Sequence, residues 1–243
     1  MSKIVNRTLD FFELFAQERR PLSLTDIMKR LDTPMSSCHD VVRALEARGY
    51  LYEVKARGGY YPTARFYQLG KLIMAHDPVA ARAEAVLQAL SDQIGASVSL
   101  SRIKGVQCTY LLVCSPPDPL RFMVVAGDNV RNLYATSAGK AALATLPLAQ
   151  RRELLEQTPL TPLTPHTKTD VEAVLADVAE GEARGWFINR EESVEDALTI
   201  SARFVRNDVS YVVTASGTLR RMERRLDEAV HALLGVTQQL AGD

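Results

Sequence analysis

The sequence predicts an α+β protein with an N-terminal winged helix-turn-helix, a linker helix and a larger C-terminal domain. In the first part of the chain, apolar residues recur at helical spacing in short segments. A pattern typical of a β-hairpin follows, with its turn around Gly58-Gly59. A helical stretch then ends at His76-Asp77-Pro78. Beyond it, amphipathic helices alternate with antiparallel strands, without the glycines of a βαβ nucleotide-binding unit. We therefore expect domains at 1–64 and 78–243, joined by a linker helix over 65–77.

Spacing and capping residues predict three helices in the first domain. Apolar residues at helical spacing indicate a helix over about 3–17. Ser23, with Asp26 three residues later, is a plausible N-cap for a second, short helix. The third helix is expected to start with Thr33 as its cap and Pro34 as its first residue, and Gly49 ends it.

Two short helices joined by a tight turn form a helix-turn-helix, whose second helix enters the DNA major groove. The segment 50–63 adds a hairpin, the wing, with basic residues at its tip that are placed to meet phosphates. Winged helices also serve as protein-interaction modules, so a module that does not bind DNA stays open as an alternative. The residues expected at a DNA interface are Ser23, Thr25, Ser36, Ser37, His39, Asp40, Arg43, Lys55 and Arg57.

The C-terminal domain is predicted as a run of helices and antiparallel strands, with a proline-rich loop over 159–168. The turn Arg206-Asn207-Asp208 separates the last two strands. We expect helices over 79–94, 137–146, 148–155, 170–184 and 219–240, and strands over 97–103, 107–114, 121–127, 186–189, 198–204 and 211–216.

Composition narrows the class of protein. The net charge is zero, yet residues 1–75 hold 12 Lys and Arg against 8 Asp and Glu, which suggests a basic module on an acidic body. No stretch approaches the ~18 apolar residues of a membrane span, and the N-terminus does not resemble a signal peptide, so we expect a cytoplasmic protein. The three cysteines match no zinc or redox spacing and are expected as buried free thiols.

An enzyme is the less favoured alternative. Ser137, His166 and several carboxylates are present, but no nucleophile elbow, HExxH, Walker or GxGxxG motif occurs. We therefore expect no catalytic residues, no cofactor and no metal.

The order and wording of several segments resemble the IclR family of transcription regulators over nearly the whole chain. The segments that carry the resemblance are LSLTDIMKRL, PMSSCHDVVRALEARGYL, ATSAGKAALA, LTPHTKTD, ARGWFINREE and LTISARF. The resemblance implies a GAF-like effector domain after the winged helix, a homodimer or a dimer of dimers on double-stranded operator DNA, and control of catabolic genes by a small, often carboxylated or aromatic metabolite. The chain departs from the family pattern at Met35, Asp40, Thr199 and Arg203.

Two features predict an effector site in the C-terminal domain. Ser137-Ala138-Gly139-Lys140 opens a helix whose free N–H groups favour an anion, unless Ser137 merely caps it and Gly139 only permits close packing. Period two places Thr199, Ser201 and Arg203 on one face of a strand, where Arg203 would suit a carboxylate. A contribution from Tyr110, Phe122, Tyr134 and Trp186 would favour an aromatic acid, although these residues also suit a core. The expected effector site comprises Ser137, Ala138, Asn189, Glu191, Thr199, Ser201, Arg203, Thr214 and Ser216, of which Asn189 and Glu191 rest on the resemblance.

Overall fold

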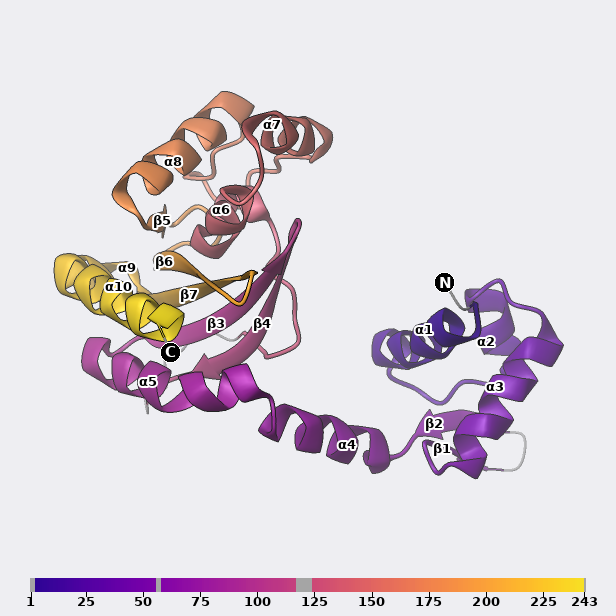
Figure 1. Ribbon diagram of the computed structural model, residues 1–243. Coiled ribbons are helices and arrows are strands. Elements are labelled where there is room, and N and C mark those ends of the chain that lie inside the picture. Colours follow the sequence, from indigo (N-terminus) through magenta and orange to yellow (C-terminus); the bar gives the residue numbers. More distant parts are fainter. Residues whose placement is uncertain (1–2, 56–57, 117–123, 243) are drawn as a thin grey trace. The chain divides into compact units, whose positions relative to one another are not determined.

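The computed structural model describes residues 3–55, 58–116 and 124–242. The chain divides into two compact units, Met1–Asp77 and Pro78–Asp243, and each is described by itself (Figure 1). Among the described residues, none of the helices has the length and apolar character that a membrane crossing requires.

The first unit is a winged helix-turn-helix, as the sequence predicts. Its two short strands pair in antiparallel fashion, and a bridge between Leu22 and Tyr60 extends the pairing. Its core is formed by Phe11, Leu14, Phe15, Leu22, Ile27, Cys38, Val42, Leu45 and Leu51. Its elements are α1 (Lys3–Glu18), α2 (Leu24–Arg30), α3 (Met35–Ala47), β1 (Leu51–Glu53), β2 (Tyr60–Pro62) and α4 (Ala64–Ala75).

The two short helices begin in different ways. The Ser23 hydroxyl accepts the N–H of Asp26 at 3.1 Å, and the Asp26 carboxylate accepts the N–H of Ser23 at 3.0 Å, which confirms the predicted cap of α2. The predicted Thr33 cap of α3 is wrong. Pro34 occupies the N-cap without a side-chain bond, because its extended backbone ends the turn one residue later, and the Thr33 hydroxyl donates to Leu31 O at 3.0 Å.

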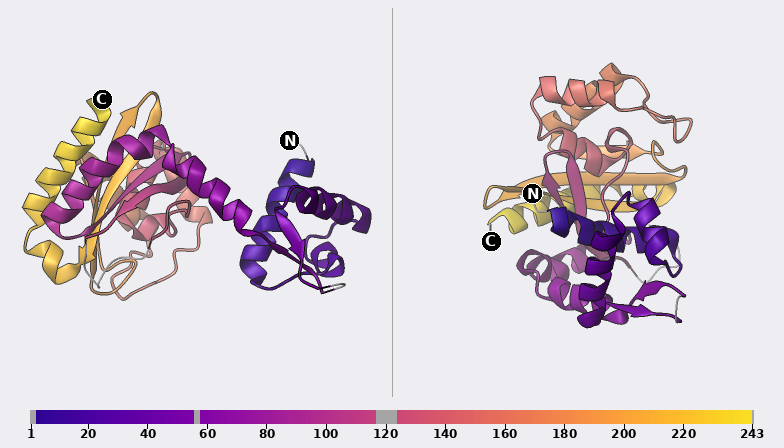
Figure 2. Two further views of the ribbon diagram at one scale, coloured as in Figure 1. Left: turned by 90° about the horizontal axis from the view of Figure 1, so that it is seen from below. Right: turned by 90° about the vertical axis from the view of Figure 1, so that its right-hand side faces the viewer.

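The second unit is built on one antiparallel sheet of order β4-β3-β7-β6-β5. Helices α5 and α10 lie side by side on one of its faces, and α6, α7 and α8 lie on the opposite side (Figures 1 and 2). The bounds are α5 (Pro78–Ile94), β3 (Ser97–Lys104), β4 (Gln107–Cys114), a 3-10 turn at Leu133–Ala135, α6 (Ser137–Leu143), α7 (Leu148–Gln157), α8 (Val171–Arg184), β5 (Phe187–Arg190), β6 (Ala197–Arg206), β7 (Val209–Thr218), α9 (Leu219–Glu223) and α10 (Leu226–Gly242).

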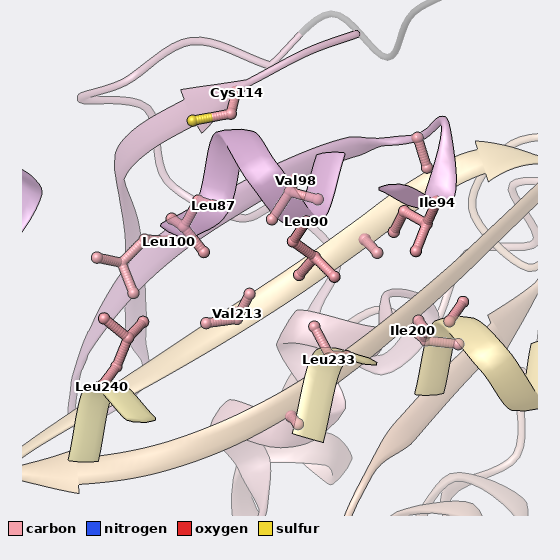
Figure 3. Packing of buried hydrophobic residues seen from close by; sticks show 14 of the residues in the cluster. Leu87, Leu90, Ile94, Val98, Leu100, Cys114, Ile200, Val213, Leu233 and Leu240 are labelled. Carbon is pink, nitrogen blue, oxygen red and sulfur yellow. The ribbon is translucent and has the colours of Figure 1, made fainter. Parts of the chain in front are cut away.

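The two faces of the sheet differ in character. Figure 3 shows leucines of α5 and α10, among them Leu90 and Leu233, pointing at Val98, Ile200 and Val213 of the strands. On the opposite face the strand register aligns two polar rows, which run Ser97–Ser216–Thr199–Asn189 and Ser99–Thr214–Ser201. The apolar face is ordinary core, and the polar face is where a site can form.

Three predicted elements differ from the structure. The described part of the expected strand 121–127, residues 124–127, is not a strand. The C-terminal helix is divided into α9 and α10, with Arg224 and Arg225 between them. Helix α6 ends at Leu143, earlier than expected, because the chain turns at Ala144, whose carbonyl accepts a hydrogen bond from Arg203.

Candidate functional site

Helix α3 presents two polar stripes. Ser36, His39 and Arg43 are exposed on one of them, and no side chain of the described residues is recorded as bonding to them. Ser37 and Asp40 lie on the other stripe, where they line a hollow of about 420 Å³ between α1 and α3. The predicted α3 residues are therefore all at the surface, but only the first stripe lies clear of α1.

The hollow beside α1 has both acidic and basic residues in its lining. Arg7 of α1 and Arg48 at the end of α3 line it together with Asp40. Asp40 therefore shares this surface with two positive charges.

The remaining predicted DNA contacts lie in α2 and the wing. Thr25 is exposed, whereas the Ser23 hydroxyl donates to Asp26 Oδ2 at 2.8 Å and so has no hydrogen left for a phosphate. Lys55 is exposed at the hairpin tip, where Gly58 N–H donates to Lys55 O at 2.6 Å. Arg57 lies outside the described residues.

A cavity of about 390 Å³ lies against the polar rows of the second unit. The sequence predicts six of the residues that line it, from α6 and from three strands: Ser137, Ala138, Asn189, Thr199, Thr214 and Ser216. The other lining residues are Tyr110, Val124, Asp128, Asn129, Val130, Arg131, Asn132, Thr136, Ser193 and Val194.

Hydroxyl groups form a connected chain at the floor of this cavity. Ser137 Oγ lies 2.6 Å from Thr199 Oγ1 and accepts a hydrogen bond of 2.8 Å from Ser201 Oγ. Ser201 Oγ in turn lies 2.8 Å from Thr214 Oγ1. Ser201 is fully buried behind the chain, so it supports the cavity wall and does not line it.

The cap at the start of α6 is one residue earlier than the alternative prediction for Ser137. Thr136 is the N-cap, since its hydroxyl accepts the N–H of Gly139 at 3.1 Å, and Ser137 is the first helical residue. A Cβ at Gly139 would overlap the backbone of Leu133, so Gly139 does permit close packing. The hydroxyl of Ser137 is thus left to the chain described above.

Asn189 and Glu191 have different surroundings. Asn189 Oδ1 accepts the N–H of Glu192 at 2.8 Å, and its amide donates to Ser193 Oγ at 2.8 Å, at the cavity wall. Glu191 does not line the cavity. Its carboxylate accepts the N–H of Asp196 at 3.0 Å and lies 3.7 Å from His166 Nε2.

Arg203 does not reach the cavity, contrary to the expectation for a carboxylate partner. Its guanidinium donates to Ala144 O at 3.1 Å, at the C-terminal end of α6, whereas the cavity lies at the N-terminal end. The alternation of side chains correctly predicts that Arg203 shares a face of β6 with Thr199 and Ser201. Arg203 lies further along the strand, however, and so reaches the C-terminal end of α6.

The cavity rim carries residues that the sequence analysis missed. The segment 127–130 is bonded to β4, with Tyr110 N–H donating to Asp128 O at 2.9 Å and Val130 N–H donating to Cys108 O at 2.7 Å. This attachment brings Asp128 and Arg131 to the rim. The predicted strand 121–127 includes only the first residue of this segment, so no signal in the sequence pointed to Asp128 or Arg131 at the cavity.

The aromatic residues and thiols have mixed roles. Tyr110 lines the cavity, and burial raises its pKa to about 12, so its hydroxyl stays protonated. Tyr134 is core, with its hydroxyl donating to Thr161 O at 2.8 Å, and Trp186 is covered by the guanidinium of Arg184. Phe122 lies outside the described residues. The cysteines are buried free thiols, as predicted.

Comparisons with known proteins agree on one family. The model "Bacterial transcriptional regulator IclR C-terminal" matches residues 72–241, and "IclR helix-turn-helix domain" matches residues 5–55. The protein named "Probable transcriptional regulator SauR" from Cupriavidus necator is 32% identical over 202 residues, which cover 83% of this chain and 79% of that protein.

Solved structures share the fold. A regulator from Alicyclobacillus acidocaldarius superposes with a TM-score of 0.79 at 22% identity, covering 100% of this chain and 98% of its own. An IclR homologue from Microbacterium hydrocarbonoxydans, solved in complex with 4-hydroxybenzoate, gives a TM-score of 0.75 at 20% identity, covering 99% of this chain and 100% of its own. On these matches, the chain belongs to the IclR family of bacterial transcriptional regulators.

Proposed function

We propose that this regulator binds operator DNA through α3 and the wing, and that a small carboxylic acid bound in the cavity of the second unit controls it. The observation that supports a carboxylic acid as effector is the chain of hydroxyl groups on the cavity floor. We further propose that the genes under control serve a catabolic pathway, as the resemblance of the sequence implies.

The hydrogens of that chain can be assigned. Ser201 donates to Ser137. Because a hydroxyl has one hydrogen, the contact between Ser201 and Thr214 must use the hydrogen of Thr214. The contact between Ser137 and Thr199 uses one of their two hydrogens. The other finds no acceptor in the described part of the chain, and Ser137 and Thr199 are both among the residues that line the cavity.

A free O–H donor calls for a ligand that accepts hydrogen bonds. A carboxylate oxygen is a strong acceptor and shortens such a bond, which makes it a better match than an amide or an alcohol. Arg131 at the rim supplies a positive charge, and it forms no ion pair with a carboxylate of the described residues. Asp128 at the same rim disfavours an anion on its own side, so the acid group is expected to lie toward Arg131 and Thr199.

The size of the cavity limits the rest of the ligand. About 390 Å³ falls in the lower part of the range for small-molecule sites, roughly 300–1,000 Å³. Tyr110, Val124, Val130 and Val194 add an aromatic ring and apolar side chains. A single-ring aromatic acid fits this description, and the homologue that holds 4-hydroxybenzoate binds a ligand of this kind.

The DNA interface follows from the exposed surface of the first unit. Ser36, His39 and Arg43 are proposed to meet base edges, with Ser37 and Asp40 nearer the backbone. Lys55 in the wing is proposed to bind phosphate, and we assign the same role to Arg57. Base edges carry the sequence information, whereas phosphate contacts add affinity that salt weakens.

A homodimer is proposed as the minimum functional state, with a dimer of dimers as the larger assembly. Large apolar side chains are exposed along two helices of the first unit: Ile4, Val5 and Leu9 of α1, and Leu69, Leu72 and Ile73 of α4. A second copy of the chain would cover such a surface, and two-fold symmetry would match a palindromic operator. The effector would then act by binding one dimer arrangement more tightly than the other.

We propose no catalytic activity. The Ser137 hydroxyl bonds to other hydroxyls, and a serine nucleophile needs a general base in that position.

Calorimetry with the full chain tests the effector class. We expect 4-hydroxybenzoate, benzoate or a short aliphatic acid to bind, and the corresponding neutral amides to bind at least about tenfold more weakly. Equal binding of acids and amides would refute the carboxylate proposal. Mobility shifts of operator DNA with and without the acid that binds test whether that binding controls the regulator.

A further inference from the structure

Behind the cavity lies a cluster of four buried or half-buried charges on four different segments. Lys140 of α6 is fully buried, and Asp177 of α8 and Glu192 are nearly so. Lys140 Nζ lies 2.5 Å from Asp177 Oδ2 and 2.5 Å from Glu192 Oε1. Lys168 approaches the same two carboxylates from the solvent side, at 3.1 Å from Asp177 Oδ2 and 3.3 Å from Glu192 Oε2.

The Lys140 ammonium has three oxygen neighbours. Nζ donates to Glu192 Oε1 at 2.5 Å and to Ile188 O at 3.1 Å, and it forms an ion pair with Asp177 Oδ2. These contacts on three sides restrict the position of the ammonium. It connects α6 to α8, to β5 and to the turn 191–196 that follows β5.

The turn that Lys140 holds forms part of the cavity wall. The N–H of Glu192 is bonded by Asn189 Oδ1, and the amide of Asn189 donates to Ser193 Oγ. Asn189 and Ser193 both line the cavity, and Asn189 directly follows the carbonyl that Lys140 binds. Moving Glu192 would therefore turn the amide of Asn189 out of its present orientation.

The loop 163–168 fixes the same turn from outside. The hydroxyls of Thr164 and Thr167 donate to the carbonyls of Glu191 and Glu192, each at 2.6 Å. The turn is thus held between Lys140 on the inside and this loop on the outside.

We propose that Lys140 is a positioning residue of the effector cavity, and that it sets the orientation of Asn189 by holding Glu192. The role as effector site rests on the proposed function, whereas the orientation of the turn does not. Burying a charge network rarely gains stability over apolar packing, so the burial of four charges at this wall favours a role in geometry.

A cycle of variants separates positioning from charge balance. Lys140→Met leaves the cluster with one excess negative charge, and the double variant Lys140→Met with Glu192→Gln restores neutrality through Lys168 and Asp177. Lys168→Met is the matched control, because it removes the same charge from the outside of the cluster. Melting temperature and hydrogen exchange of the segment 189–194 are measured on the full chain without ligand, and 4-hydroxybenzoate is the first binding probe.

If Lys140 positions the turn, the melting temperature and the hydrogen exchange of the segment 189–194 respond differently to the variants. Lys140→Met lowers the Tm by roughly 10 °C, and the double variant recovers most of that loss. In both, the segment 189–194 exchanges about tenfold faster and the acid that wild type binds is held about tenfold more weakly. Lys168→Met keeps slow exchange there. Glu192→Gln alone also keeps it, since the amide oxygen still accepts from Lys140.

The contrary results are equally definite. If the double variant recovers slow exchange and acid affinity along with its Tm, Lys140 only neutralises the buried carboxylates and does not position the turn. A double variant that fails to fold would assign Lys140 to the core, and fast exchange in Glu192→Gln would show that the carboxylate alone matters. If wild type binds no acid, the proposed effector class fails, but the exchange measurements still decide the role of Lys140.

Discussion

The hydroxyl oxygens of Ser137 and Thr199 lie 2.6 Å apart, although 62 positions separate them in the chain. This contact joins the first turn of α6 to the beginning of β6, and both residues line the cavity. One hydrogen serves the contact between the two hydroxyl groups, so substitution of either side chain tests the proposed site.

Thr199→Val is expected to weaken binding of the acid by about 5- to 30-fold, because it removes a hydroxyl from the cavity while keeping the side-chain volume. Thr145→Val is the matched control, since the Thr145 hydroxyl donates to Ala142 O outside the cavity. Calorimetry on both variants measures the effect. Equal affinity of Thr199→Val and wild type would remove Thr199 from the site.

Arg131→Gln is expected to narrow the preference for an acid over its amide, because the rim then lacks its positive charge. An exposed charge pair is worth at most about 1 kcal/mol, so a loss of roughly threefold to fivefold in acid affinity is expected, with amide affinity unchanged. Arg203→Gln is the matched control and should leave the preference intact. The reverse outcome, with Arg203→Gln reducing acid affinity and Arg131→Gln leaving it unaffected, would contradict the proposed orientation of the acid.

The sequence predicted which residues share a face of each strand because the alternation of side chains along a strand is a local property. It predicted Thr199, Ser201, Thr214 and Ser216 on one face, and the structure places them there. The sequence could not predict which end of α6 the Arg203 side chain contacts, since that depends on how β6 and α6 lie against each other in the fold. Lys140 was visible only as part of a helix start, because its partner Glu192 is 52 positions away and the fold alone brings them together.

On the DNA side, Arg43→Ala is expected to weaken operator binding by about 1–3 kcal/mol and to relax the sequence preference, since Arg43 lies on the exposed stripe of α3.

The wing variants Lys55→Ala and Arg57→Ala should instead weaken binding to all sequences alike and reduce its dependence on salt. Ser37→Ala is expected to weaken operator binding less than Arg43→Ala, because Ser37 faces the α1 hollow. Mobility shifts at several salt concentrations, on operator and unrelated DNA, make the comparison. Unchanged affinity in Arg43→Ala would mean that α3 docks through another face.

Exposed apolar residues of α4 give a test of assembly. Leu72→Asp with Ile73→Asp is expected to shift the protein toward monomer at micromolar concentration, because a second copy would have to bury both charges. Leu148→Asp on α7 is the matched control, since Leu148 is 62% exposed and Leu72 is 61% exposed. Light scattering gives the molar mass. A wild-type monomer, or an α4 variant that assembles as wild type does, would contradict the dimer proposal.

The last prediction concerns pH. Burial alone would raise the pKa of Asp177, but the ammonium groups of Lys140 and then Lys168 more than offset this and hold that pKa below its ordinary value of 3.8. A lowered folded-state pKa gives stability that is present above the unfolded value and is lost as pH falls through the folded one. Asp177→Asn removes this contribution, and breaking the buried pairing should cost roughly 3–5 kcal/mol at neutral pH.

The stability difference between wild type and Asp177→Asn should therefore stay constant from about pH 5 to pH 8 and narrow only below pH 3.8. Lys168 acts at the other extreme. Burial opposes its charge, but Glu192 and Asp177 raise its pKa above 10.5, so its contribution is lost only in strong alkali. Thermal melts of both proteins from pH 3 to pH 8 measure the difference. A difference that changes between pH 5 and pH 8 would show that a group in the cluster titrates near neutrality, and the cluster would then be a pH sensor instead of a fixed support for the cavity wall.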